Sequence, residues 1–228
     1  MPRFHRKLIL DGLTALRGTS ARKPVLRLLV WLHNTSYHQI SFFASHTGIH
    51  PKHAIQNYYR FFLEHIDPTD RVLDVGSGNG AVAYKLAEKA KVVAGIDIRP
   101  ANVAHAKKTY QRDNLEFLVG DATTYSFQEP FDVIVLSNVL EHIEHRIEFL
   151  QKLQHVAPKI LIRVPMLTRD WITVYKKEQG LPYRLDDTHF IEYTTEVFRR
   201  EMKEAGLKIE HLHVNFGELY AVVRKDQK

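Results

Sequence analysis

A glycine-rich turn behind a short apolar segment is the part of the chain best suited to chemistry. Residues 72–75 (Val-Leu-Asp-Val) lead into glycines at positions 76, 78 and 80, and a helical pattern follows. Because glycine has no Cβ atom, such a turn lets the backbone approach a ligand closely. The glycine spacing formally fits a dinucleotide. The carboxylate of Asp74, however, would repel a pyrophosphate and suits a cationic group, such as the ammonium of an amino acid.

Polar residues also end the next three apolar segments. Residues 92–97 end in Asp97, residues 115–122 carry Asp121 near their end, and residues 131–138 end in Ser-Asn. An acid about 20 residues after a glycine turn is the usual partner of a ribose diol. One such acid would fit a turn or a helix cap equally well. Three acids at successive strand ends, counting Asp74, favour one shared ligand site.

Four motifs together resemble the class I S-adenosylmethionine-dependent methyltransferases over roughly residues 55–225. They are DVGSGNG (74–80), GID (95–97), GDA (120–122) and FDVIVLSNVLEH (131–142). The resemblance implies S-adenosyl-L-methionine as cofactor and S-adenosyl-L-homocysteine as product. It places the methionine end on the glycine turn, the ribose on Asp97 and the adenine on Asp121. The cofactor-binding residues that it implies are Asp74, Gly76, Ser77, Gly78, Asp97, Ile98, Asp121, Ala122, Ser137 and Asn138.

Three histidines are candidates for the catalytic base. Methyl transfer to an oxygen needs an acceptor held in line with the sulfonium carbon, and a group that removes the acceptor's proton. A histidine has a pKa near neutrality and suits this task. His142 and His145 follow the fourth predicted strand, and His189 lies in a long loop after the fifth. Long loops are usually functional, and this one is rich in Trp, Tyr, Arg and Asp, which suits a sugar or a phenol.

A divalent metal is the alternative use of this region. Glu141 and His142 lie about one helical turn after Asn138, and His189 could join them from the loop. Small-RNA 2′-O-methyltransferases and some ubiquinone-biosynthesis O-methyltransferases have a similar Glu-x-x-Glu-His cluster. In this chain Asn138 replaces the first Glu, which removes one anionic ligand. The ligand count therefore favours a metal-free site. If a metal binds, its expected ligands are Glu141, His142 and His189.

The order of elements predicts an α/β fold. Strand and helix patterns alternate from Arg71 to a fifth strand at 159–164, which indicates a parallel sheet with helices on both faces. Segments 208–216 and 218–225 are joined at Gly217, a connection too short for a crossover, so they must pair antiparallel. We therefore expect a Rossmann-like doubly wound sheet of seven strands, five parallel plus a C-terminal antiparallel hairpin, with extra N-terminal helices. An aromatic-rich helical stretch at 54–66 precedes the first strand.

Two domains of unequal size are expected, a helical extension over residues 1–53 and the methyltransferase domain over residues 54–228. Residues 1–60 hold nine basic residues and one acid, so their net charge is +8, whereas that of the whole chain is +6. With its apolar clusters, this region is predicted to contact an anionic membrane surface peripherally, or else to form a lid over the cofactor. No apolar run approaches the ~20 residues needed to cross a bilayer.

The absence of cysteine excludes disulfides and thiolate chemistry and fits a reducing cytoplasm. The predicted function is O-methylation of a hydroxyl on a small molecule, a sugar or a lipid-linked glycan. Segments 50–53 (His-Pro-Lys-His) and 163–166 (Arg-Val-Pro-Met) resemble those of bacterial methyltransferases of surface-polysaccharide or lipid pathways. An RNA 2′-O-methyltransferase is the alternative, although no RNA-binding module is recognisable. A catalytically silent cofactor-binding subunit is the third hypothesis.

Overall fold

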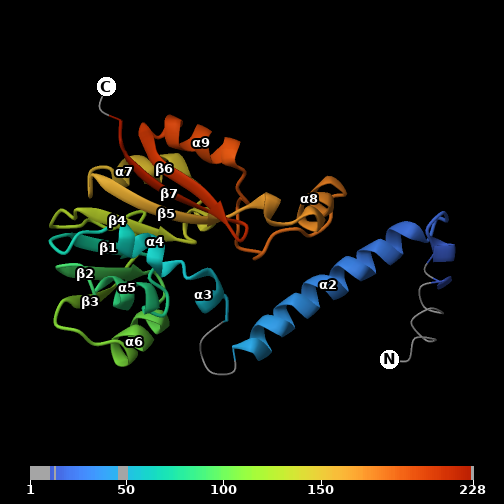
Figure 1. Ribbon diagram of the computed structural model, residues 1–228, viewed down its shortest axis with the longest axis horizontal. Helices are drawn as coiled ribbons and strands as arrows, with labels where there is room; N and C mark the ends of the chain where they lie inside the picture. The colour runs from blue at the N-terminus through green and yellow to red at the C-terminus, as the bar shows by residue number, and fades with distance from the viewer. Residues whose placement is uncertain (1–10, 13, 46–50, 227–228) are drawn as a thin grey trace. The chain divides into compact units, whose positions relative to one another are not determined.

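The computed structural model describes residues 11–12, 14–45 and 51–226. The chain divides into two compact units (Figure 1). One unit comprises the chain up to Ala54 together with Tyr175–Tyr183, and the other comprises Ile55–Val174 together with Arg184–Lys228. The predicted domain boundary after residue 53 stays a prediction. The segment 175–183 is far from the N-terminal region in sequence, and no local pattern assigned it there.

A seven-stranded sheet in the order β3-β2-β1-β4-β5-β7-β6 forms the larger unit. Its strands are β1 (Arg71–Val75), β2 (Val92–Asp97), β3 (Leu115–Val119), β4 (Val133–Ser137), β5 (Lys159–Pro165), β6 (Leu207–Asn215) and β7 (Glu218–Lys225). The pairs among β1 to β5 are parallel, whereas β7 pairs antiparallel with both β5 and β6. The predicted fold class is therefore confirmed. The hairpin turns at Phe216 and Gly217, which both have positive φ.

Helices cover both faces of this sheet, as a doubly wound fold requires (Figure 1). They are α4 (Tyr59–Glu64), α5 (Ala81–Leu86), α6 (Pro100–Thr109), α7 (Arg146–Leu153) and α9 (Thr195–Glu204), with the short helices η1 (Leu140–His142) and η2 (Leu167–Arg169). Apolar residues of α4, α5 and α6 join one core cluster, and those of α7 and α9 join the other. Because β4 and β5 pack against helices on both faces, their sequences are almost continuous apolar runs.

The helical stretch predicted at 54–66 is two helices. α3 (Pro51–Gln56) ends before Asn57, whose φ of 44° is left-handed, and α4 begins at Tyr59. Asparagine is one of the few residues that adopts this conformation at low cost. The apolar periodicity continues across the break, so the sequence pattern did not reveal it.

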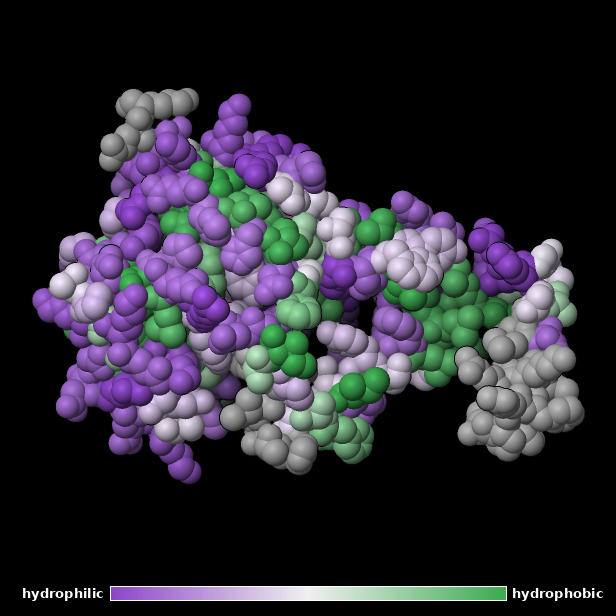
Figure 2. All heavy atoms as spheres, in the orientation of Figure 1, coloured by the Kyte–Doolittle hydropathy of each residue, from purple (hydrophilic) through white to green (hydrophobic). Residues whose placement is uncertain are grey.

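In the smaller unit, α2 (Arg22–Ala44) contacts the segment 175–183, which includes the end of α8 (Trp171–Glu178). Lys176 Nζ donates to Asn34 Oδ1 at 2.7 Å, and Asn34 Nδ2 donates to Pro182 O at 3.3 Å. Apolar residues also gather along α2 in the space-filling view (Figure 2). None of the helices in the described part of the chain combines the length and apolar character needed to cross a membrane.

Candidate active site

A cavity of about 1110 Å³ opens at the carboxyl ends of β1 to β4. The strand order runs outward from β1 in one direction and from β4 in the other, which makes this the switch point where open α/β sheets bind ligands. The predicted cofactor residues that line the cavity are Gly76, Asp97, Ile98, Asp121, Ala122 and Asn138. All three predicted base candidates, His142, His145 and His189, line it as well.

The glycine turn after β1 is shaped by backbone that only glycine adopts readily. Gly76 and Gly80 have φ values of 65° and 89°. A Cβ atom on Gly76 would lie 2.8 Å from a methyl of Val139, and one on Gly80 would lie 2.8 Å from Ala106 and Phe117. The turn is therefore fixed both by its left-handed conformation and by close packing from beneath. It presents bare backbone at the edge of the cavity.

Asp97, at the end of β2, fastens this turn to the neighbouring strand. Its Oδ2 accepts a hydrogen bond from Gly78 N at 2.8 Å. Its Oδ1 accepts from Arg99 N at 2.8 Å and from Asn102 Nδ2 at 3.1 Å. An ionised carboxylate has about four acceptor positions, so one position stays open at the cavity wall. Asp97 can therefore hold the turn and still accept a hydrogen bond from a ligand hydroxyl.

Asp121 and Asn138 extend the polar wall from β3 and β4. Asp121 Oδ1 accepts from the amide and the hydroxyl of Thr123, at 2.9 and 2.7 Å. Asn138 has a left-handed φ of 58°, and its Oδ1 accepts from Arg163 Nε at 3.0 Å. These bonds fix both side chains at the points where their strands end.

Four predicted cofactor residues are not part of the cavity lining: Asp74, Ser77, Gly78 and Ser137. Asp74 is only 1% exposed, and its Oδ2 has no hydrogen-bond partner among the described residues. Burial raises the pKa of Asp74 to about 8, and the charge of Asp97 adds to this, while the Ala83 amide opposes it. A direct contact between Asp74 and a ligand stays a prediction, since in this structure the residue lies beneath the turn.

His142 and His189 come together on the opposite side of the cavity. Their ring centroids are 4.5 Å apart and the rings are nearly perpendicular. Thr188 Oγ1 donates to Asp186 Oδ1 at 2.7 Å and lies 2.8 Å from His142 Nδ1. Because a hydroxyl has one hydrogen, we assign the remaining proton to His142 Nδ1. This leaves Nε2 of His142 as its basic nitrogen.

His189 is buried and is held by a carboxylate. Its Nδ1 lies 3.0 Å from Glu192 Oε1, so Nδ1 carries the hydrogen and Nε2 is the basic nitrogen. Glu192 is itself fixed, since its Oε1 accepts from Leu185 N and its Oε2 from Arg169 Nη1, both at 2.7 Å. An imidazole held by a carboxylate at one nitrogen is well placed to accept a proton at the other.

Glu141 lies beside this pair and is fully buried. Neither of its carboxylate oxygens has a hydrogen-bond partner among the described residues, and burial raises its pKa to about 8. One ligand atom each from Glu141, His142 and His189 lie within 4.8 Å of one another. The structure thus brings together the three residues that the sequence predicted as ligands of a metal. Asn138 is not in this group, and its Oδ1 accepts a hydrogen bond from Arg163 instead.

The surroundings of His142 also lower the pKa of its ring. Desolvation of its ring lowers the pKa of His142, and the nearby His189 lowers it further, while Asp186 opposes both. Desolvation and His189 therefore both favour the neutral form of His142, which can accept a proton. The third candidate, His145, lines the cavity just before α7 (Arg146–Leu153), and no carboxylate among the described residues bonds to its ring.

Sequence reasoning missed the residues that support these histidines. Glu192 and Arg169 form the buried ion pair behind His189, and Thr188 orients His142. Arg163 was noted only as part of a motif, yet its guanidinium stacks 3.8 Å from the ring centre of Tyr58. An acid three residues after His189 was a usable signal for Glu192. Nothing local pointed to Arg169 or Thr188, because their partners are distant in sequence.

The sequence model of a methyltransferase domain family matches residues 48–212. Among curated relatives, an uncharacterised protein of Methanocaldococcus jannaschii is 38% identical over 73 residues, which are 31% of this chain and 28% of the relative. A ubiquinone biosynthesis O-methyltransferase of Rickettsia typhi is 28% identical over 102 residues, or 43% of this chain and 42% of the relative. The matches thus span less than half of the length of these relatives.

Solved structures show the same fold. A putative methyltransferase of Haloferax volcanii, in complex with the Trm112 methyltransferase activator, superposes with a TM-score of 0.61 at 15% identity, covering 76% of this chain and 92% of that chain. The N-methyltransferase NodS of Bradyrhizobium japonicum, in complex with S-adenosyl-L-homocysteine, superposes with a TM-score of 0.57 at 18% identity. The superposition covers 76% of this chain and 87% of that chain.

Proposed function

Because the chain belongs to the class I S-adenosylmethionine-dependent methyltransferases, we propose that it methylates a hydroxyl oxygen of a small polar acceptor, with His142 and His189 as the proton-accepting pair. S-adenosylmethionine is the cofactor of this family, and one neighbour was crystallised with its demethylated product. When bound, it supplies an electrophilic methyl carbon on a sulfonium. The acceptor and the roles of individual residues are the proposed part.

The cavity residues fit this cofactor. The glycine turn lines the cavity with the backbone of Gly76, and Asp97 retains one acceptor position for a ribose hydroxyl. Asp121 and Ala122 lie at the next strand, where the adenine edge is expected. A cationic methionine end would be stabilised by negative charge near the turn, and it would favour the ionised form of buried Asp74, whose Oδ2 has no hydrogen-bond partner among the described residues.

His189 and His142 supply the proposed base. Each has its Nδ1 engaged, by Glu192 and Thr188 respectively, so each directs its reactivity to Nε2. With the cofactor bound, the methyl carbon would pass to the acceptor oxygen as its bond to sulfur breaks, and Nε2 of His142 or His189 would accept the proton that the oxygen loses. The carboxylate of Glu192 then stabilises the imidazolium of His189. The arrangement Arg169–Glu192–His189–His142 is the single observation that carries the proposal.

The charge of the cavity favours a neutral acceptor over RNA. Its lining has six acidic residues, Asp97, Asp121, Glu144, Glu148, Asp186 and Asp187, against three basic ones, Arg99, Lys152 and Arg184. A phosphate backbone would be repelled by this excess. Phe190 and Arg184 belong to the same loop, and an aromatic ring beside polar groups suits a sugar or a phenol.

A metal at Glu141, His142 and His189 is the competing use of the same residues. Two imidazoles and one carboxylate are a ligand set found in catalytic zinc sites. A bound cation would also favour the ionised form of Glu141, whose burial otherwise opposes ionisation. A chelator distinguishes the two uses. Loss of activity in chelator, restored by a divalent ion, would assign these residues as ligands and not as bases.

The decisive experiment measures transfer of a labelled methyl group to phenols, hexoses and small RNA. His189→Ala and His142→Ala are each expected to lower turnover by roughly 10²–10⁴-fold while the cofactor dissociation constant barely changes. His155→Ala, at an exposed position, is the matched control. Near-normal turnover in both variants would refute the base assignment. Labelling of RNA alone would favour the RNA hypothesis, and cofactor binding without transfer to any acceptor would favour a silent subunit.

We also propose that α2 makes the predicted peripheral contact with an anionic surface. Three basic residues and no acid lie in this helix. Its exposed apolar residues are Leu28, Leu29, Trp31, Leu32, Tyr37, Ile40, Phe42 and Phe43. Positions 28, 29, 32, 40 and 43 share one side of a helix. An apolar side with basic residues near one end of the helix suits the interface of an anionic bilayer.

A further inference from the structure

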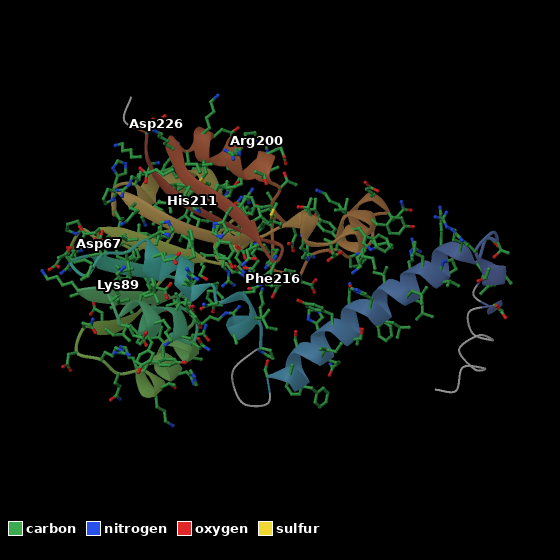
Figure 3. All side chains as sticks on the ribbon, in the orientation of Figure 1. Asp67, Lys89, Arg200, His211, Phe216 and Asp226 are labelled. Atoms are coloured by element: carbon green, nitrogen blue, oxygen red, sulfur yellow. The ribbon has the colours of Figure 1, made fainter. Side chains whose placement is uncertain are left out.

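Three histidines gather at a second site, separate from the cofactor cavity. His65 follows α4, while His211 and His213 lie on β6, where Figure 3 labels His211. Residues two apart on a strand point to the same face, so His211 and His213 are neighbours. The three line a pocket of about 310 Å³ that shares no lining residue with the cofactor cavity.

The spacing of the rings is close to that of imidazoles on one metal ion. The ring centroids of His211 and His213 are 5.2 Å apart, and those of His65 and His211 are 5.6 Å apart. With zinc–nitrogen bonds of about 2.0–2.1 Å, two imidazoles on one tetrahedral ion have nitrogens about 3.3 Å apart and ring centroids roughly 5 Å apart. His211 Nε2 and His213 Nδ1 are 3.1 Å apart.

Hydrogen bonding also leaves one nitrogen of His65 available to a metal. His65 Nδ1 lies 2.8 Å from Phe61 O, so it carries the hydrogen and Nε2 is left as the ligand atom. Histidine ligands commonly hold their second nitrogen on a backbone carbonyl in this way.

The rest of the pocket suits a hydrated ion. Tyr220 Oη and Gln56 Oε1 are buried there without a hydrogen-bond partner among the described residues. A water on the ion could bond to either. The rings of Tyr220 and His213 stack with centroids 4.9 Å apart, which limits where His213 can turn.

We propose that His65, His211 and His213 bind a transition-metal ion that prefers imidazole ligands, such as Zn²⁺ or Ni²⁺. His211 and His213 form the chelating pair. His65 joins them by a movement of its side chain, because in this structure the three histidines do not bring one nitrogen each within 4.8 Å of one another. The ion joins α4 to the edge strand β6, so it stabilises the fold. The site is independent of the methyl-transfer proposal, since none of its residues lines the cofactor cavity.

The test uses the His142→Ala/His189→Ala double variant as background, which removes the competing ligands of the first site. Titration of the metal-free protein with Ni²⁺ by calorimetry is expected to show one site, and Zn²⁺ is expected to raise the melting temperature. Adding His211→Gln should weaken Ni²⁺ binding at least about tenfold and abolish the Zn²⁺-dependent stabilisation, because it removes one of three ligands. His211 is exposed, so this variant is expected to fold.

His105→Gln, at an exposed position on α6 (Pro100–Thr109), is the matched control and should leave both readouts unchanged. Cobalt substitution gives an independent readout, since Co²⁺ in a tetrahedral nitrogen site has a visible absorption band that His65→Gln should reduce. Absence of Ni²⁺ binding in the background protein would overturn the proposal. Equal binding with and without His211→Gln would overturn it as well.

Discussion

Substitution of Glu141 by glutamine is expected to remove a pH-dependent loss of stability. Glu141 is fully buried, neither carboxylate oxygen has a hydrogen-bond partner among the described residues, and its pKa is raised to about 8 from an ordinary value of 4.5. Desolvation is the main cause, and the charges of Glu218 and Glu192 add to it, whereas the backbone N–H of Glu141 itself and the charge of Arg163 oppose it. Glutamine has nearly the shape of the protonated acid and stays neutral at every pH.

The sign and size follow from proton linkage. Because the folded-state pKa is raised, the stabilisation from protonated Glu141 is fully present below about pH 4.5 and is lost as the pH rises to about 8. Within that window the unfolded chain releases its proton and the folded chain keeps it. Each pH unit then costs the wild type about 1.4 kcal/mol of unfolding free energy. Over the window the loss is on the order of 5 kcal/mol, and the glutamine variant avoids it.

Urea unfolding of both proteins between about pH 5 and about pH 8, with a chelator present, measures this difference. The advantage of Glu141→Gln over the wild type should be small at pH 5 and grow by about 1.4 kcal/mol per pH unit. Asp74, also raised to about pKa 8, is common to both proteins and cancels. Glu144→Gln, at an exposed position, should follow the wild type. A difference that does not change with pH would refute the reasoning.

Three further predictions concern the cofactor, the base and α2. Asp97→Ala should weaken cofactor binding by about 1–3 kcal/mol in calorimetry, because the cofactor loses a charged hydrogen-bond acceptor. Asp67→Ala, at an exposed position, is the control, and equal affinity of the two variants would contradict the prediction. Glu192→Gln should lower kcat at least about tenfold with little change in KM, because His189 loses its charged partner; an unchanged kcat would exclude Glu192 from the mechanism. Leu32→Ser with Phe43→Ser should reduce co-sedimentation with anionic vesicles, which salt should also weaken. If the wild type does not sediment with vesicles at low salt, the lid role of the N-terminal region is the surviving hypothesis.

Local sequence was sufficient for the sheet and for one wall of the site. Alternating strand and helix patterns predicted the five parallel strands, and the short connection at Gly217 predicted the terminal hairpin, because both follow from chain geometry. The carboxyl ends of parallel strands meet at one edge, so Asp97, Asp121 and Asn138 could be placed together before the structure was seen. The left-handed Asn57, by contrast, interrupted a continuous apolar pattern and divided a predicted helix.

The opposite wall depended on tertiary structure. Thr188 and His142 are 46 positions apart, and Arg169 and Glu192 are 23 apart, so their pairing is set by how loops fold over the sheet and has no local periodicity. Burial is likewise a property of the whole fold. The sequence by itself determined that Glu141 follows the fourth strand. Only packing from every side removed water from its carboxylate, and that desolvation decides its charge.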